Sequence, residues 1–526
     1  MIRIRDLSLS ANDDLSRLMQ AAARQLRIRE TEIKQVQIRR KSVDARKKSD
    51  VRIIYTVDVE VKGREDKILR AARCPKASIP EDYLYTVPKP ARLPESRPVI
   101  VGFGPAGIFC ALVLSMAGLR PIVLERGADA ETRKAAVETF WKTGVLDPDS
   151  NVQFGEGGAG TFSDGKLNTG VKNERDRWIL EQFANAGAGG EILFDAKPHI
   201  GTDVLPGVVK NLREKILHYG GEVRFRTRMT GLQIQDGRVT AVETPTETLP
   251  CSHLILAIGH SARDTFALLH EAGIPMEPKP FSMGVRIEHP QQMVNESQYG
   301  PFADCPNLGA ADYKLNVKLP DGTSAYTFCM CPGGGVVAAA SEPGGVVTNG
   351  QSPAARNGNN ANAALLVTLH PEDFPDKSVL GGMYWQREIE QTAFRAGGSN
   401  YYAPAQLVGD FLKKQPSASF GDVEPTYRPG VTLCDLHDVL PERITSVLEN
   451  ALPELEKRLK GFARPDAVMT APETRSSSPV RILRDETRQS SLRGLYPCGE
   501  GAGYAGGIMS AAIDGMLTAE AVIASL

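Results

Sequence analysis

A glycine pattern near residue 100 has the residue types and spacing that bind a dinucleotide. Gly102, Gly104 and Gly107 form a GxGxxG motif directly after the apolar run 98–101. The first glycine permits a tight turn, the second lets the backbone approach a pyrophosphate, and the third allows a helix to pack closely on a strand. Free N–H groups and the positive dipole end at the start of that helix then bind the phosphates.

This chemistry requires a strand, a helix and a second strand to position the glycines. The sequence predicts a short strand before Gly102, a helix over 106–117 and a second strand over 120–125. Glu125 ends that strand, where its carboxylate can accept hydrogen bonds from a ribose diol. The apolar stretch inside the helix is its buried face, and we predict no membrane span. The predicted contacts of this unit are Gly102, Gly104, Pro105, Ala106, Gly107, Glu125 and Arg126.

A second glycine-rich stretch, 155–166, is predicted to bring backbone N–H groups against the same ligand. Its candidate contacts are Gly157, Gly158 and Gly160. Lys166 closes the stretch and could place a positive charge beside a bound ring, so it is also a candidate for catalysis. The alternative interpretation is a flexible surface loop with a solvated lysine.

The chain is predicted to return to the nucleotide sheet near its end. A buried strand over 254–258 ends in Gly259, and Gly499-Glu500 precedes a helix that runs to about residue 524. N–H groups at the start of that helix could face a ring oxygen where negative charge develops. The alternative is simply a tight turn from loop to helix. The candidate contacts here are Gly259, Gly499, Glu500, Gly506, Gly507 and Ile508.

These motifs resemble the glutathione-reductase-like superfamily of two-dinucleotide-fold flavoproteins. The resemblance implies that the first motif binds the ADP half of FAD and that 257–259 lies against the cofactor. It also implies that Gly499-Glu500 contacts the ribityl-phosphate side, with Glu in place of the commoner Asp. Four segments together resemble a family of uncharacterised bacterial FAD-dependent dehydrogenases, of the NAD(FAD)-utilising type. They are 155–167, 259–264, 329–334 and 499–507.

Three side chains are weak candidates for catalysis, and no acid or base is assigned. His260 follows Gly259 and could exchange a proton, as could His289, but an ordinary hydrogen-bonding histidine is the favoured interpretation of each. Arg475 could hold an anionic substrate, or it could pair with a neighbouring Asp. Lys166 could tune the ring of the reduced flavin through its charge.

The eight cysteines and eight histidines show no metal-ligand spacing, and we predict no metal site. The close pair Cys329 and Cys331 invites a redox-disulfide interpretation. Because CxC pairs rarely form an unstrained bridge, we predict buried structural thiols instead. All eight cysteines are predicted to be free, as in a reducing compartment.

Composition predicts an ordinary globular protein of 526 residues, with 41% hydrophobic and 24% charged residues. Formal net charge is −1, but residues 1–97 carry 23 Lys+Arg against 14 Asp+Glu, a balance of +9. No signal peptide is evident, so a cytoplasmic location is expected. The basic run 39–48 permits binding to nucleic acid, but a solvated or docking face is the favoured interpretation.

The predicted fold class is α/β: a Rossmann-like FAD-binding domain of glutathione-reductase type, in three ββα layers, with two additional domains. Residues 1–85 are predicted to be a basic, ferredoxin-like α/β domain with element order β-α-β-β-α. Residues 11–14 are predicted to cap its first helix, which runs to about residue 26, and the basic residues 39–41 and 46–48 are predicted to lie between strands at 33–38 and 51–61. Residues 86–96 are a proline-rich linker. The FAD-binding domain spans 97–284 and 466–526, and 285–465 is an inserted α+β substrate domain.

The predicted function is that of an FAD-dependent oxidoreductase, which holds FAD non-covalently and transfers hydride through flavin N5 on an unidentified small molecule. No second GxGxxG unit is found, so NADH or NADPH would bind transiently, or a protein partner would deliver electrons. One alternative is a flavin monooxygenase. Another is an FAD-containing RNA- or protein-binding factor that uses the basic N-terminal domain as its contact surface. The oligomeric state does not follow from the sequence.

Overall fold

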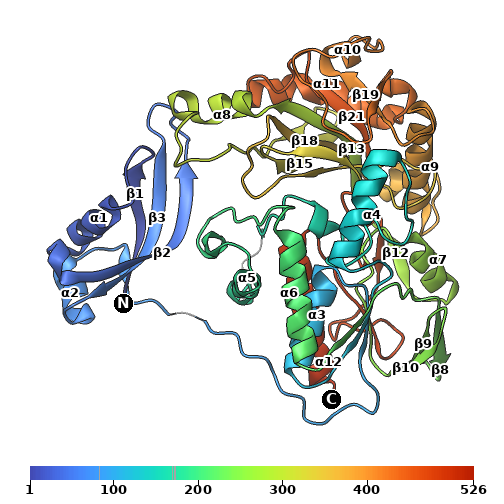
Figure 1. The fold of residues 1–526 in the computed structure, drawn as a ribbon, viewed down its shortest axis with the longest axis horizontal. Helices are drawn as coiled ribbons and strands as arrows, with labels where there is room; N and C mark the ends of the chain where they lie inside the picture. The colour runs from blue at the N-terminus through green and yellow to red at the C-terminus, as the bar shows by residue number, and fades with distance from the viewer. Residues whose placement is uncertain (82, 169, 171–172) are drawn as a thin grey trace.

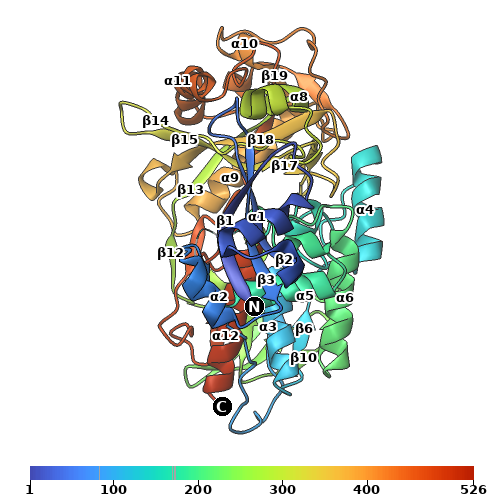
Figure 2. The ribbon, with the colours of Figure 1, turned by 90° about the vertical axis from the view of Figure 1, so that its left-hand side faces the viewer.

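The computed structural model describes residues 1–81, 83–168, 170 and 173–526. Figure 1 shows a small N-terminal unit in blue beside a larger body, joined to it by a long linker that passes beneath the body. The body consists of a parallel-sheet part, with α3, α6 and α12, and a second sheet above it (Figures 1 and 2).

The N-terminal unit is a four-stranded antiparallel sheet, in the order β2-β3-β1-β4, with two helices on one face. Alternate strand residues, such as Ile4 and Val57, are buried against α1. The order of elements agrees with the predicted one and adds a short edge strand, β4. The elements are β1 (Ile2–Ser10), α1 (Arg17–Leu26), β2 (Ile33–Asp44), β3 (Arg52–Val61), α2 (Glu65–Ala72) and β4 (Ala77–Ser78).

Two local predictions in this unit are wrong. The first helix begins at Arg17 because the Asp13 and Asp14 carboxylates accept backbone hydrogen bonds in a preceding turn, which leaves Leu15 exposed. The basic residues 39–41 lie within β2, where they pair with β3, and not in the loop between the strands.

The parallel sheet has five strands in the order β23-β11-β5-β6-β7. Alternate residues face opposite layers: Ile100 packs with α3, α6 and α12, whereas Val99 and Val101 pack with the antiparallel sheet β10-β9-β8. The strands are β5 (Val99–Val101), β6 (Ile122–Leu124), β7 (Glu222–Arg224), β8 (Gly231–Gln235), β9 (Arg238–Glu243), β10 (Thr248–Pro250), β11 (Leu254–Leu256) and β23 (Leu495–Pro497). The helices are α3 (Pro105–Met116), α4 (Ala130–Thr143), α5 (Asp176–Asn185), α6 (Leu205–His218), α7 (Arg263–Glu271) and α12 (Ile508–Ala524).

The second sheet has seven strands, in the order β14-β15-β18-β13-β21-β19-β20. Its apolar face packs on α11, whereas its other face carries Arg286, Asn362 and Thr470 beneath the hairpin β16–β17. Its strands are β13 (Phe281–Pro290), β14 (Asn316–Lys318), β15 (Ser324–Cys331), β18 (Asn360–Leu369), β19 (Ala403–Leu407), β20 (Val431–Leu433) and β21 (Val468–Glu473). The elements around it are β12 (Met276–Pro278), α8 (Gln291–Tyr299), β16 (Gly335–Ala338), β17 (Thr348–Gln351), α9 (Gly381–Ala396), α10 (Val408–Phe411), α11 (Glu442–Arg458) and β22 (Val480–Ile482).

The N-terminal unit contacts both parts of the body. The Lys41 N–H donates to the Phe194 carbonyl at 2.7 Å, and the Asn307 amide donates to the Ala11 carbonyl at 2.8 Å. A groove of about 960 Å³ separates the open face of its sheet from α5. Both basic and acidic side chains line the groove. The basic ones are Arg3, Arg5, Arg39, Arg40 and Arg177, and the acidic ones are Asp6, Glu81, Glu174 and Glu181. The basic run therefore lies partly against acidic side chains of the body.

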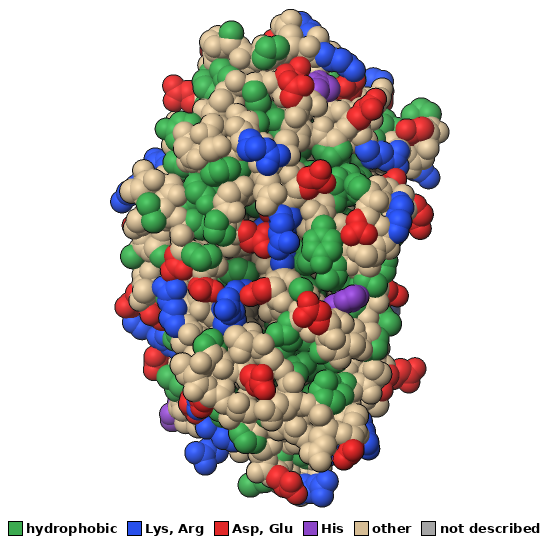
Figure 3. Space-filling view, turned by 90° about the vertical axis from the view of Figure 1, so that its right-hand side faces the viewer, with side chains coloured by type: hydrophobic (Ala, Val, Ile, Leu, Met, Phe, Trp, Pro, Cys, Tyr) green, Lys and Arg blue, Asp and Glu red, His purple; other side chains and the backbone are tan. Residues whose placement is uncertain are grey.

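The opposite side of the molecule has a mixed surface. Figure 3 shows acidic and basic side chains interspersed over the face that carries α7 and α9. Within the described part of the chain, no helix is long and apolar enough to cross a membrane.

Candidate dinucleotide site

The GxGxxG turn forms where β5 meets α3, as predicted. Gly102 has a φ of +100°, and a Cβ there would lie 2.3 Å from the Ala257 carbonyl oxygen. A Cβ on Gly107 would lie 2.0 Å from the Gly102 carbonyl oxygen. Packing within the protein therefore requires glycine at both positions.

Gly104 differs because the protein itself leaves room for a side chain there. A Cβ at Gly104 would meet only the Cα of Gly158, at an ordinary 3.7 Å. Gly104 is the N-cap of α3, and within the described part of the chain no side-chain hydrogen bond caps this helix. The open space and free N–H groups fit a pyrophosphate on this helix end.

Glu125 ends β6 but is already partly engaged. Its Oε1 accepts hydrogen bonds from the N–H groups of Gly127 and Gly155, at 2.8 and 2.9 Å, and Oε2 accepts from Phe103 at 2.9 Å. An ionised carboxylate offers about four lone-pair sites. About one of these sites remains for a ribose hydroxyl. Through the other three, Glu125 links the GxGxxG turn to the loop at Gly155, a role that the sequence did not predict.

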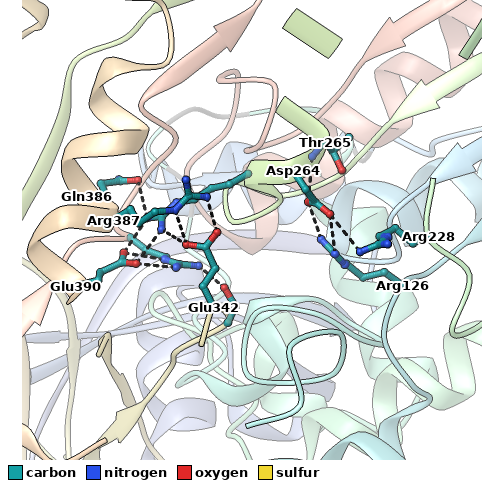
Figure 4. Close-up of polar contacts among 11 residues, drawn as sticks. Arg126, Arg228, Asp264, Thr265, Glu342, Gln386, Arg387 and Glu390 are labelled. Carbon is teal, nitrogen blue, oxygen red and sulfur yellow. Dashed lines mark hydrogen bonds and ion pairs between the residues drawn. The ribbon is translucent and has the colours of Figure 1, made fainter. Parts of the chain in front are cut away.

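Arg126, a predicted cofactor contact, forms a bidentate ion pair with Asp264 at 2.9 and 3.0 Å (Figure 4). It also donates to Asp149 at 3.2 Å, and its guanidinium lies 4.2 Å from the Phe154 ring centroid. Burial raises the pKa of Asp264, but the hydrogen bonds from Arg126 outweigh it and hold that pKa below its usual value. The partner of Arg126 within the protein is thus a carboxylate.

The stretch 155–166 is packed, and the interpretation of it as a flexible surface loop is wrong. The buried guanidinium of Arg133 donates to the carbonyls of Asn151, Val152 and Glu156 at 2.7–2.9 Å. These bonds fix the chain that leads into the loop. A Cβ on Gly160 would lie 3.2 Å from Ile508, so the loop reaches the start of α12.

Lys166 is not solvated at the loop's end. Its ammonium donates to the carbonyl of Met330, in β15 of the second sheet. The loop thus spans from the glycines beside α3 to the other part of the body.

The predicted segments at Gly259 and at 499–508 lie side by side. A Cβ on Gly501 would lie 2.4 Å from the Gly259 carbonyl oxygen, and the Nδ1 of His260 lies 3.2 Å from Oε1 of Glu500. The Nε2 of His260 is buried and has no partner among the described residues. This orphaned nitrogen and the Glu500 carboxylate offer polar groups to a ligand. Gly506 and Gly507 precede α12, and a Cβ on either would meet nothing within 4 Å.

Sequence reasoning missed the residues that hold the Gly499 turn. The Asp514 carboxylate accepts the Gly499 N–H at 2.7 Å and a bidentate pair from Arg484 at 2.7 and 2.9 Å. Burial opposes ionisation of Asp514, but Arg484 outweighs it and holds the pKa below its usual value. The available signal was an acid, Asp514, in the small and apolar first half of the last helix.

Arg475 is sealed inside a charged cluster and not aimed at an open pocket. It forms a bidentate pair with Glu390 at 2.9 and 3.0 Å, and Arg263 forms a second such pair with the same carboxylate. Burial alone would raise the pKa of Glu390, but the two guanidinium groups hold it well below its usual range. Of the two alternatives for Arg475, the carboxylate partner is observed, with Glu in place of Asp.

His289 lies apart from these glycines, in the core of the second sheet. Its Nε2 is 2.7 Å from the Phe462 carbonyl oxygen, and its ring packs beside Tyr313 and Phe462. Complete burial lowers the pKa of His289 to about 4. It is a hydrogen-bonding core histidine.

Comparison with known proteins adds a family to this geometry. Residues 280–476 match the family described as "FAD-dependent protein, C-terminal domain-like", and residues 1–60 match a domain of unknown function. An uncharacterised protein of Clostridium beijerinckii is 46% identical over 527 residues, covering 99% of this chain and 98% of the relative. The chain belongs to the same family as this Clostridium protein, and its residues 280–476 carry the domain that is described as FAD-dependent. The similarity to the Clostridium protein extends over the N-terminal unit as well.

Solved flavoprotein structures show only distant likeness to this family member. Glycine oxidase of Bacillus cereus is 13% identical, covers 82% of this chain and 95% of its own, and has a TM-score of 0.29. L-proline dehydrogenase of P. horikoshii is 12% identical with the same two coverages and a TM-score of 0.34. L-amino acid deaminase of Proteus vulgaris is 13% identical, covers 85% and 96%, and has a TM-score of 0.33. At these scores we base no conclusion on them.

Proposed function

We propose that the protein binds FAD non-covalently in the glycine cradle and is an oxidoreductase that acts on a small molecule. We call four glycines the cradle because a Cβ on each would meet no close contact among the described residues: Gly104, Gly259, Gly506 and Gly507. The observation that carries the proposal is that Gly104 needs no glycine for the protein's own packing, yet lies at an uncapped helix start. Bound FAD would supply hydride transfer at its N5 position.

The chain's own residues would bind and orient the cofactor. N–H groups in the first turn of α3 would bind the pyrophosphate, and the remaining lone pair of Glu125 would accept from the ribose. Glu500 and His260, 3.2 Å apart, would offer an acceptor and a ring nitrogen to the ribityl side. N–H groups at the start of α12 would stabilise negative charge that develops on the reduced ring.

The proposed domain division keeps the parallel sheet in one domain but divides the second sheet, because β13 crosses residue 284 and β21 lies within 466–526. Residues 1–85 would be a ferredoxin-like unit, since β2-β3-β1-β4 is the split β-α-β order. The linker would be 86–96. The FAD-binding domain, of glutathione-reductase type, would comprise 97–284 and 466–526, because β23 pairs in parallel with β11. The inserted domain, 285–465, would cover the cradle and define the substrate.

The test is the visible spectrum of the purified protein, followed by anaerobic addition of NADH or NADPH. We expect a flavin band after incubation with FAD; no band would overturn the proposal. Bleaching by one nicotinamide would identify a transient pyridine-nucleotide donor. A band that persists would point to reduction by the substrate or by a donor protein.

A further inference from the structure

Two cysteines at the end of β15 lie together where the second sheet meets the loop 155–166. The pairing of β15 with β18 is interrupted by a bulge between Phe328 and Cys331, and Cys329 has a φ of +48°. The Cys331 thiol donates to the Cys329 carbonyl oxygen at 3.2 Å, and the two thiols are close enough to affect each other's ionisation. Cys331 is buried, whereas Cys329 is only half-buried. The pair is thus not the fully buried pair that the sequence predicted.

Two cations flank this pair. The Lys166 ammonium donates to the carbonyl of Met330, the residue between the two cysteines. The fully buried Arg286 donates to the Cys329 carbonyl at 3.0 Å and is held by a bidentate pair with Glu473. Arg286 cannot lose its proton in a protein, so positive charge beside Cys329 is permanent.

These surroundings make the two thiols unequal. The interaction with Cys331 and the nearby charges of Lys166 and Arg286 outweigh burial and the opposing charge of Asp164. Together they lower the pKa of Cys329 to about 6. The same interaction and burial raise the pKa of Cys331. Elsewhere, burial raises the pKa of Cys251 to about 12 and that of Cys434 to about 11. At neutral pH, Cys329 is thus a thiolate beside a protonated thiol.

We propose that Cys329 and Cys331 form a redox-active dithiol that reduces low-molecular-weight disulfides, with Cys329 as the attacking sulfur and Cys331 as the resolving one. The Cys329 thiolate attacks one sulfur of the disulfide, whose S–S bond breaks and releases one thiolate. Cys331 then gives its proton to a released thiolate, and its sulfur attacks Cys329 and expels the second half. Overall, the two cysteines lose two electrons and form one S–S bond. The external disulfide gains these two electrons and is released as two thiols.

A bridge between residues two apart is strained, and strained disulfides are the labile, catalytic ones rather than the structural ones. This site is distinct from the glycine cradle and does not require FAD. Lys166 nevertheless belongs to the loop that borders the cradle, so the two sites share one segment of chain.

The first experiment measures alkylation of Cys329 by iodoacetamide against pH in the full-length protein, by peptide mass spectrometry. We expect a half-maximal rate near pH 6, compared with about 8.5 for a free cysteine. Cys331→Ala removes the interaction with the second thiol and should lower the rate at pH 7 roughly ten-fold. A midpoint above pH 8 in the wild type would overturn the proposal.

The second experiment incubates the reduced protein with glutathione disulfide and maps the products. The wild type should give a Cys329–Cys331 disulfide, Cys331→Ser should stop at a mixed disulfide on Cys329, and Cys329→Ser should not react at this site. Cys251→Ser, at a buried thiol elsewhere, is the matched control and should behave as the wild type does. A wild type that stops at the mixed disulfide would contradict the resolving role. Both readouts are taken with and without FAD, so failure of FAD binding would leave this test intact.

Discussion

Two regions of the molecule differ in how far their polar groups are paired. One is the glycine cradle at the starts of α3 and α12, and the other is the arginine cluster around Glu390. In the cradle, helix N–H groups and the buried Nε2 of His260 have no side-chain partner among the described residues, and glycines leave space beside them. In the cluster, Arg263 and Arg475 clamp one carboxylate from both sides. A region that binds a ligand keeps hydrogen-bonding capacity unused, whereas charges that are fully paired serve the fold.

The largest expected effect on stability comes from removing the shared carboxylate of the arginine cluster. Glu390→Ala leaves two buried guanidinium groups without their shared carboxylate, and we expect a loss of about 3–5 kcal/mol in the free energy of unfolding. Urea denaturation measures this loss. Glu342→Ala, at a more exposed carboxylate that pairs with Arg263 and Arg387, should cost clearly less. If Glu390→Ala instead lost FAD at full stability, the cluster would belong to the cofactor site.

Acid should destabilise the second sheet through His289. Its pKa is about 4 in the folded protein and about 6.5 when unfolded, so below pH 6.5 the unfolded chain binds a proton that the folded chain does not. The contribution of neutral His289 to the free energy of unfolding is therefore fully present above pH 6.5. It is lost as the pH falls toward 4, which lowers the free energy of unfolding by about 3 kcal/mol. His289→Gln should reduce the slope of stability against pH in this window. An unchanged slope would contradict the assignment.

Gly104→Ala should separate binding from folding. The added methyl group occupies the space over the start of α3, and we expect FAD affinity to fall at least about ten-fold, or ~1.4 kcal/mol. Stability without FAD should change by less than about 1 kcal/mol, since only Gly158 is touched. Gly207→Ala, at an exposed and open position in α6, is the control. Equal FAD affinity in the two variants would refute the proposed cradle.

The smallest effect is expected at Arg126. Its partner Asp264 is about half exposed, so Arg126→Ala should cost at most about 1 kcal/mol of stability. FAD affinity should change less than in Gly104→Ala, as titrated by flavin fluorescence. A larger loss of FAD would return Arg126 to the cofactor contacts that the sequence predicted.

Local signals predicted the elements of the cradle well. The helix expected over 106–117 is α3, Pro105–Met116, and the helix expected to end near residue 524 is α12, Ile508–Ala524. Apolar periodicity and glycine placement act over a few residues, so they can be read along the chain. The start of α1 was misplaced because aspartates that stabilise a turn resemble helix caps.

Partners far apart in sequence were not predictable. Arg475 and Glu390 are 85 residues apart, and Arg286 and Glu473 are 187 apart. An arginine's type shows that it needs an anion but not whether a ligand or a distant carboxylate supplies it. Asp514 was missed for the same reason, since its role depends on Arg484 and on the Gly499 turn.

The sequence by itself determined where the GxGxxG turn lies, because Gly102 adopts a positive φ in the turn and Gly107 packs against the neighbouring Gly102 carbonyl. Tertiary structure alone decided which charged groups are sealed and which remain open. It placed Lys166 next to β15, beside Cys329 and Cys331, and it paired Arg475 with Glu390. The physical reason is that pairing and desolvation depend on which distant side chain fills the adjacent space, and no local pattern records that neighbour.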